Sequence, residues 1–189
     1  RGGLDRFVLD TDPGFGDAVI TRLNRFKIRV EVDFELTTQS WRAIRGVQGT
    51  SIQGVIPAWR MDGTAVDVFA GQATMPTSIV EGMWEHYEVE RISAAWPVMG
   101  TDVTTDMIPA ETGVVDLAVS FAKGCYPGQE LVERMDSRGS RAPRSLVKIE
   151  CTSGTRQGDE VMVDGEVVGR ITSVQGEIAL AIVKRGTFV

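Results

Sequence analysis

The chain has 189 residues, a formal net charge of −6, two cysteines and one histidine. Its length suits one large or two modest domains, its negative charge argues against strong direct binding to nucleic acid, and no apolar run approaches the roughly 18 residues of a membrane span. The cysteines are too few for a disulfide scaffold and indicate a reducing compartment, expected to be the cytoplasm, and the single histidine excludes a histidine-rich metal site.

The first part of the chain predicts a strand, a turn, a helix and a second strand. Residues 4–9 are typical of a strand, and residues 10–16 predict a turn because they are rich in Asp, Pro and Gly. Apolar residues at helical spacing predict a helix over residues 17–26. Residues 27–36 alternate between charged and apolar side chains, which is the clearest pattern in the chain and predicts a half-buried strand.

The middle of the chain mixes short strands with a longer helix. Strands separated by glycine turns are expected around residues 41–47, 54–60 and 65–69. Ser78 and Glu81 fit a capping box, which predicts a helix that runs from there to about residue 95 and is ended by Trp96-Pro97. Residues 98–113 are loop-like, and a short apolar segment follows at residues 114–121.

One stretch carries more chemically capable side chains than any other: Lys123-Gly124-Cys125-Tyr126-Pro127-Gly128-Gln129-Glu130. The Pro-Gly pair predicts a turn, and residues 129–135 have helical composition, so Cys125 should lie just before a helix N-terminus. There the helix dipole and Lys123 both favour a reactive thiolate, and a small buried cysteine is the alternative. Gln129 and Glu130 are expected to cap the loop or to pair with Lys123.

The last part of the chain is rich in β-forming residues. After an exposed linker, four runs separated by Gly-Asp or Gly-Glu turns follow at residues 146–150, 160–163, 166–174 and 177–183. Their even spacing predicts a small antiparallel barrel or sandwich. We therefore expect an α+β fold with domains at residues 1–142 and 143–189. The basic residues between Arg134 and Lys148 form either a solvated loop or a docking surface for an acidic partner or tRNA.

The stretch from Lys123 to Glu130 resembles the signature of the YgfZ-type folate-binding proteins, which are relatives of the glycine-cleavage (GcvT-like) aminomethyltransferases. Two further groups stand at the usual spacing of that family: Arg91, Ile92, Ala94 and Pro97, then Pro109, Glu111 and Gly113. Ser93 and Ala95 stand where the family pattern often has Glu and Gly. Cys125 favours the YgfZ branch over the true aminomethyltransferases.

For the fold, the resemblance implies an aminomethyltransferase-like folate-binding region followed by a small C-terminal antiparallel β-barrel. The N-terminal part of that region is expected to be absent from this chain, or supplied as a separate chain. For function, it implies a tetrahydrofolate-binding accessory protein that supports iron–sulfur cluster assembly or repair and, through client enzymes, tRNA modification.

The partners implied are a folate and iron–sulfur client enzymes or assembly proteins, with no membrane and no resident metal. A folate-dependent aminomethyltransferase of the glycine-cleavage type is the alternative, and the resemblance leaves open whether the chain catalyses any reaction of its own. One cysteine cannot hold a cluster by itself, because such clusters usually take four protein ligands, so any cluster would be shared or transient.

The resemblance also implies a set of site residues. Cys125 is the expected reactive or contact group, and Glu111 is expected to pair with a pterin through its carboxylate. Tyr87, with Trp84 one turn before it, is expected to stack on a ligand ring, and Arg134 to meet the glutamate tail. The remaining expected pocket residues are Lys123, Gly124, Tyr126, Gly128, Gln129 and Glu130. Simpler structural alternatives are a solvated loop acid for Glu111 and core packing for Tyr87.

Overall fold

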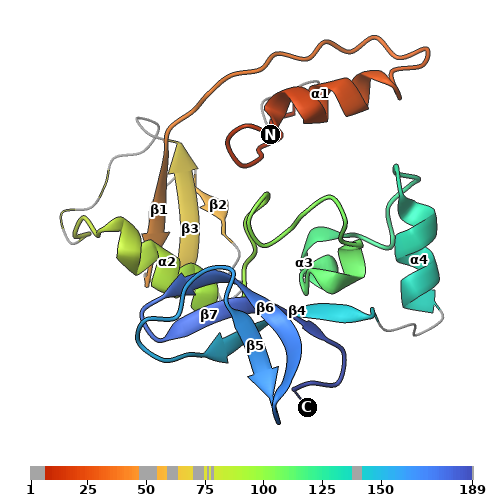
Figure 1. Ribbon diagram of the computed structural model, residues 1–189. Coiled ribbons are helices and arrows are strands. Elements are labelled where there is room, and N and C mark those ends of the chain that lie inside the picture. The colour runs from red at the N-terminus through yellow and green to blue at the C-terminus, as the bar shows by residue number, and fades with distance from the viewer. Residues whose placement is uncertain are drawn as a thin grey trace. The chain divides into compact units, whose positions relative to one another are not determined.

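The computed structural model of the chain describes residues 7–46, 55–58, 64–69, 75, 77, 79–137 and 142–188 (Figure 1). It separates into two compact units, Arg1–Ser40 and Trp41–Val189, and each is described below by itself. The fold is α+β with antiparallel sheets, as the sequence predicts. The domain boundary expected near residue 143 stays a prediction.

The described part of the first unit contains helix α1 (Gly16–Asn24). A turn precedes it, in which the Phe15 N–H donates to the Asp12 carbonyl at 3.3 Å and Gly14 has a φ of 90°. Asp17 in the first turn and Arg22 in the last turn both have the charge that the helix dipole favours. The predicted turn and helix are therefore confirmed.

The strands predicted on either side of α1 are wrong over the residues that the structure describes. Residues 7–9 and 27–36 are not paired in any sheet, and Ile28 and Val30 are exposed. Alternation predicts which side chains share a face, but a strand also needs a neighbour that accepts and donates its backbone hydrogen bonds. Residues 4–6 lie outside the described part of the chain.

The second unit begins with a three-stranded antiparallel sheet in the order β1-β3-β2, made of β1 (Trp41–Arg45), β2 (Ile56–Pro57) and β3 (Ala65–Phe69). One face buries Ile44, Val66 and Val68. Trp41 pairs with Phe69 across the strands, and their ring centroids lie 4.2 Å apart. The three predicted strands are confirmed where they fall on described residues.

Helix α2 (Trp84–Ser93) starts later than the capping-box pattern predicts. Ser78 lies outside the described residues, and residues 79–83 are not helical. The Met83 N–H donates instead to Nδ1 of His86 at 3.4 Å. Gly82, a poor helix former, lies two residues before the observed start and disfavours a helix that extends further back.

The end of α2 is close to the prediction. The Trp96 N–H donates to the Arg91 carbonyl at 3.0 Å, and the Ala95 N–H to the Ile92 carbonyl at 2.9 Å. These two bonds form a Schellman motif, whose left-handed residue is Ala95 with a φ of 53°. The residue that the family pattern often replaces with glycine is thus the one whose backbone favours glycine.

Three short helical segments follow: η1 (Pro109–Glu111), α3 (Val115–Ala118) and α4 (Gln129–Ser137). Helix α4 confirms the helix predicted after the Pro-Gly turn. The side-chain oxygen of Gln129 accepts a hydrogen bond from the Tyr126 N–H at 3.0 Å, so the predicted capping role of Gln129 is also confirmed.

The C-terminal strands form one antiparallel sheet in the order β4-β7-β6-β5, with β4 (Arg144–Glu150), β5 (Glu160–Val163), β6 (Glu166–Gln175) and β7 (Ile178–Lys184). All four predicted runs are strands. The β5–β6 hairpin turns at Asp164-Gly165, both with positive φ, as tight hairpins require. A core cluster of Ile92, Leu146 and Leu180 packs α2 against this sheet.

Candidate functional site

The motif segment, residues 123–130, is a surface loop that leads into α4. Lys123, Gly124, Cys125 and Gly128 are exposed, and so is Glu130. Both cysteines are free, and the exposure of Cys125 rules out the alternative of a small buried cysteine. Its thiol is therefore accessible to a partner, as a reactive cysteine must be.

Within this segment, the ammonium group of Lys123 lies 4.5 Å from the ring centroid of Tyr126. That distance is typical of a cation–π contact. The backbone of Tyr126 is in turn fixed by Gln129. The structure thus brings Lys123, Tyr126 and Gln129 together as supports of the loop that carries Cys125.

Glu111 is almost fully buried, with 2% of its surface exposed, so the solvated-acid alternative is wrong. Arg144 on β4 holds it with two bonds, Nε to Oε1 at 2.8 Å and Nη2 to Oε2 at 3.0 Å, and the Ile108 N–H donates to Oε2 at 3.1 Å. The hydrogen bonds from Arg144 lower the pKa of Glu111 despite its burial. Glu111 is therefore an ionised carboxylate already engaged by its own chain.

Arg144 was missed as a site residue because the sequence placed it only in a basic cluster. It also bridges to Asp106, with Nη2 at 3.3 Å from Oδ2. Asp106 is exposed, and a hydrogen bond from Thr104 is the main cause that lowers its pKa. The available signal was a basic residue that follows Pro143 at the start of a strand, but nothing local pointed to a partner 33 residues earlier.

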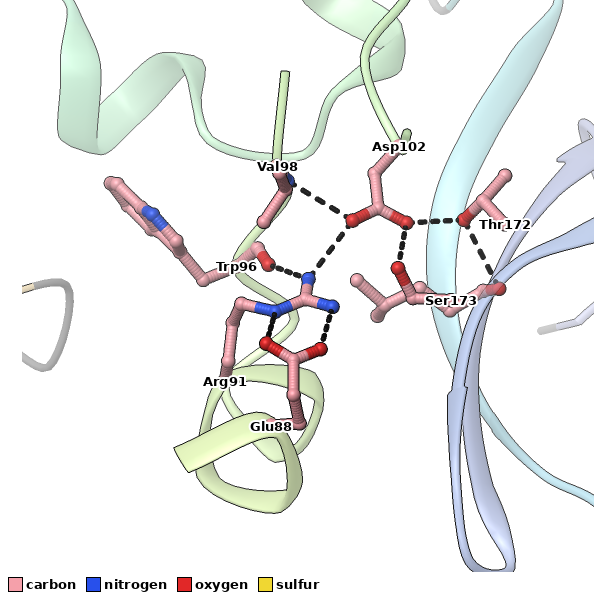
Figure 2. Close-up of polar contacts among 8 residues, drawn as sticks. Glu88, Arg91, Trp96, Val98, Asp102, Thr172 and Ser173 are labelled. Carbon is pink, nitrogen blue, oxygen red and sulfur yellow. Dashed lines mark hydrogen bonds and ion pairs between the residues drawn. The ribbon is translucent and has the colours of Figure 1, made fainter. Parts of the chain in front are cut away.

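A buried ion network joins α2 to the C-terminal sheet (Figure 2). Glu88 accepts two bonds from the Arg91 guanidinium, at 3.0 and 2.6 Å, and Asp102 accepts a third from Nη1 at 2.9 Å. Asp102 also accepts from the Val98 N–H at 3.0 Å and from the hydroxyls of Thr172 and Ser173 on β6.

Burial alone would lower the pKa of Arg91, yet the hydrogen bond to Glu88 and the charge of Asp102 outweigh it and raise the pKa. Arg91 thus holds structural carboxylates. Arg134 is exposed on α4 and is accessible to a ligand.

The aromatic residues of α2 form a second candidate surface. Tyr87 is half-buried, and its ring centroid lies 4.9 Å from that of Trp84, which is 69% exposed. The Arg45 guanidinium lies 5.4 Å from the Tyr87 ring centroid. Core packing therefore accounts for part of the Tyr87 surface, and the open aromatic face belongs mainly to Trp84.

A cavity of about 230 Å³ lies among η1, α3 and α4, and Ala110, Phe121, Val132 and the carboxylate of Asp116 are among the side chains that line it. Its volume is below the roughly 300–1,000 Å³ typical of ligand pockets. Its lining, taken over the described residues, includes none of the expected site residues. A ligand that touches the exposed members of the predicted set, such as Cys125 and Arg134, would therefore lie outside this cavity.

Two kinds of site are absent from the residues that the structure describes. No group of three His, Cys, Asp or Glu side chains there is arranged to hold a metal ion. None of the helices described is long and apolar enough to span a bilayer.

No family model matches the chain. It is 28% identical, over 210 aligned positions, to the iron–sulfur cluster assembly factor IBA57, mitochondrial, of Mus musculus, a match that covers 98% of this chain and 58% of that protein. It is 44% identical over 50 residues to the tRNA-modifying protein YgfZ of Yersinia enterocolitica, covering 26% of this chain and 15% of the relative. It is 34% identical over 85 residues to an aminomethyltransferase of Halalkalibacterium halodurans, a match that covers 44% of this chain and 22% of that protein.

The chain spans about half the length of the curated relatives it matches most fully, 58% of the mouse protein and 55% of a Haemophilus influenzae protein to which it is 26% identical. The relatives include members of the two groups that the motif segment resembles, together with a protein named for iron–sulfur cluster assembly. The chain is therefore a relative of the YgfZ-type proteins, of an iron–sulfur assembly factor and of the aminomethyltransferases, as its sequence had indicated.

Proposed function

We propose that the protein binds tetrahydrofolate and supports the assembly or repair of iron–sulfur clusters, acting on client enzymes or assembly proteins. Through such clients it would contribute to tRNA modification, and we place it in the cytoplasm. The observation that carries the proposal is the exposed thiol of Cys125, presented on a capped loop at the start of α4. Relatives named for cluster assembly and for tRNA modification support it.

Cys125 would act as a contact or transient ligand for a cluster that passes to or from a client. Since one thiolate supplies a quarter of the usual ligand set, the partner would provide the others. An accessible thiol suits this exchange because a partner can approach it without rearrangement of the core.

The folate would contact the aromatic pair on α2 and the Glu111–Arg144 pair. The Glu111 carboxylate is 2% exposed and held by Arg144, so its pairing with pterin N–H groups would require Arg144 to move aside and release it. Arg134 would meet the glutamate tail. The rest of the motif segment would line the site through Lys123, Gly124, Tyr126, Gly128, Gln129 and Glu130.

We propose further that residues 1–142 form the aminomethyltransferase-like folate-binding region and that residues 143–189 close into a small β-barrel. The match to an aminomethyltransferase keeps folate-dependent aminomethyl transfer as the second candidate. That activity needs a carboxylate near the reacting folate nitrogen.

The thiol hypothesis is tested by Cys125→Ser in a strain that lacks its own copy of the gene. We expect that this variant no longer restores the activity of a cluster-dependent enzyme in that strain. The measurement is the activity of that enzyme. Cys151→Ser is the matched control, because Cys151 is the other free cysteine and is half-buried beside the core of the C-terminal sheet. Full activity with Cys125→Ser would refute the role of the thiol.

A further inference from the structure

We propose that Trp84 is the side chain that stacks on a planar ring of the ligand, and that Arg45 is a positioning residue that holds Tyr87, and through it Trp84, in place. The inference rests on the proposed function, since the ligand is the folate named there. It concerns three residues from two elements, here called the aromatic cluster: Arg45 on β1 and Trp84 and Tyr87 on α2.

Trp84 offers the open ring of this cluster. It is the first residue of α2 and is 69% exposed, whereas Tyr87, one turn later, is half-buried. The two rings are tilted by 32° with centroids 4.9 Å apart, which is an ordinary geometry for an attractive aromatic pair. A large, exposed indole supported from behind by a second ring is suited to stack on a planar heteroaromatic ligand.

Arg45 links this pair to the sheet. Its Nη1 donates to the carbonyls of Ile44 and Val66 at 3.0 and 2.9 Å, and to Oδ1 of Asp67 at 2.8 Å. Its side chain is only 11% exposed, so water screens the guanidinium weakly. The position of the cation under Tyr87, 5.4 Å from the ring centroid, is therefore fixed by β1 and β3 and not by the helix itself.

The consequence is pre-organisation. A tryptophan in the first turn of a helix normally samples several rotamers, and a ligand that stacks on it must bear the entropic cost of fixing one. Here the chain Asp67–Arg45–Tyr87–Trp84 fixes the ring before the ligand arrives. Loss of Arg45 should weaken binding even though Arg45 itself never touches the ligand.

The test is calorimetric titration of the full chain with tetrahydrofolate under anaerobic conditions, in four variants. We expect Trp84→Ala to raise the dissociation constant about tenfold and Arg45→Met about threefold, by the usual strength of an aromatic pair and of a cation–π contact. Arg45→Lys keeps a cation beneath Tyr87 and should restore most of the affinity. Trp41→Phe, which alters a different aromatic pair, should bind as the wild type does.

A second readout separates positioning from general stability. The near-ultraviolet circular dichroism band that disappears in Trp84→Ala should also disappear in Arg45→Met and persist in Arg45→Lys, at a temperature where all variants are folded. Equal affinity of Arg45→Met and wild type, or an unchanged band, would overturn the positioning role. Equal affinity of Trp84→Ala and wild type would overturn the stacking role, whereas no binding by the wild type would overturn the proposed function itself.

Discussion

Replacement of Asp102 by alanine should be the most damaging single change in the buried network. Asp102 is 1% exposed and accepts bonds from Arg91, the Val98 N–H, Thr172 and Ser173. Its removal takes an acceptor from all four donors, although Arg91 keeps Glu88 and the Trp96 carbonyl and the Thr172 hydroxyl keeps the Leu180 carbonyl. Removal of one member of a buried ion pair typically costs about 3–5 kcal/mol, so we expect a loss of that size in the free energy of unfolding.

Asp102→Asn should cost less, about 1–3 kcal/mol, the usual value of a hydrogen bond to a charged group. Its amide oxygen can face Arg91 and Val98 while its amide nitrogen donates to the hydroxyls of Thr172 and Ser173. The assay is urea unfolding at pH 7, followed by circular dichroism. Asp33→Asn is the control, because Asp33 is fully exposed and its ion pair with Lys27 lies in the first unit. The reasoning would be refuted if the free energy of unfolding of Asp102→Ala lay within about 1 kcal/mol of the wild-type value. It would also be refuted if Asp102→Asn were less stable than Asp102→Ala.

Three further changes follow from the same structure. Ala95→Gly should raise the free energy of unfolding by about 1 kcal/mol, because Ala95 has a φ of 53°; a lower melting temperature would contradict this. Arg144 lowers the pKa of Glu111 from its usual value of 4.5, so the contribution of Glu111 to the free energy of unfolding should be complete above pH 4.5 and lost as the pH falls through the folded-state pKa. In Glu111→Gln the loss of stability in acid should be smaller than in the wild type. Identical plots of unfolding free energy against pH for the two proteins would contradict this. Gly169→Ala should cost about 2 kcal/mol or more because its Cβ would lie 2.3 Å from the Ile182 carbonyl oxygen, whereas Gly124→Ala, with open space around it, should be neutral in the same unfolding assay.

Local patterns in the sequence predicted much of the secondary structure. The apolar spacing of α1, the Pro-Gly turn before α4 and the four β-rich runs of the C-terminal sheet each depend on neighbours within a few residues. The strand predicted at residues 27–36 failed for the opposite reason, since its alternation is local but the required partner strand is not. Likewise, the start of α2 was set by contacts at Met83 and His86 that the Ser78–Glu81 pattern did not contain.

The candidate site was predictable in its residue types but not in its pairings. The motif segment resembles the YgfZ-type proteins, and a YgfZ protein is among the relatives. Cys125 is accessible, as a reactive thiol must be. The partner of Glu111 is Arg144, 33 residues away, and the partners of Asp102 on β6 are about 70 residues away. Such contacts follow from the packing of strands against other elements, so patterns among neighbouring residues in the sequence do not reveal them.

The most direct test of the account is a calorimetric titration of tetrahydrofolate into the wild-type chain. We expect saturable binding at one site per chain, with an affinity that falls in Trp84→Ala and in Glu111→Gln. Heats that match the dilution of folate into buffer would contradict it, as would binding that both substitutions leave unchanged.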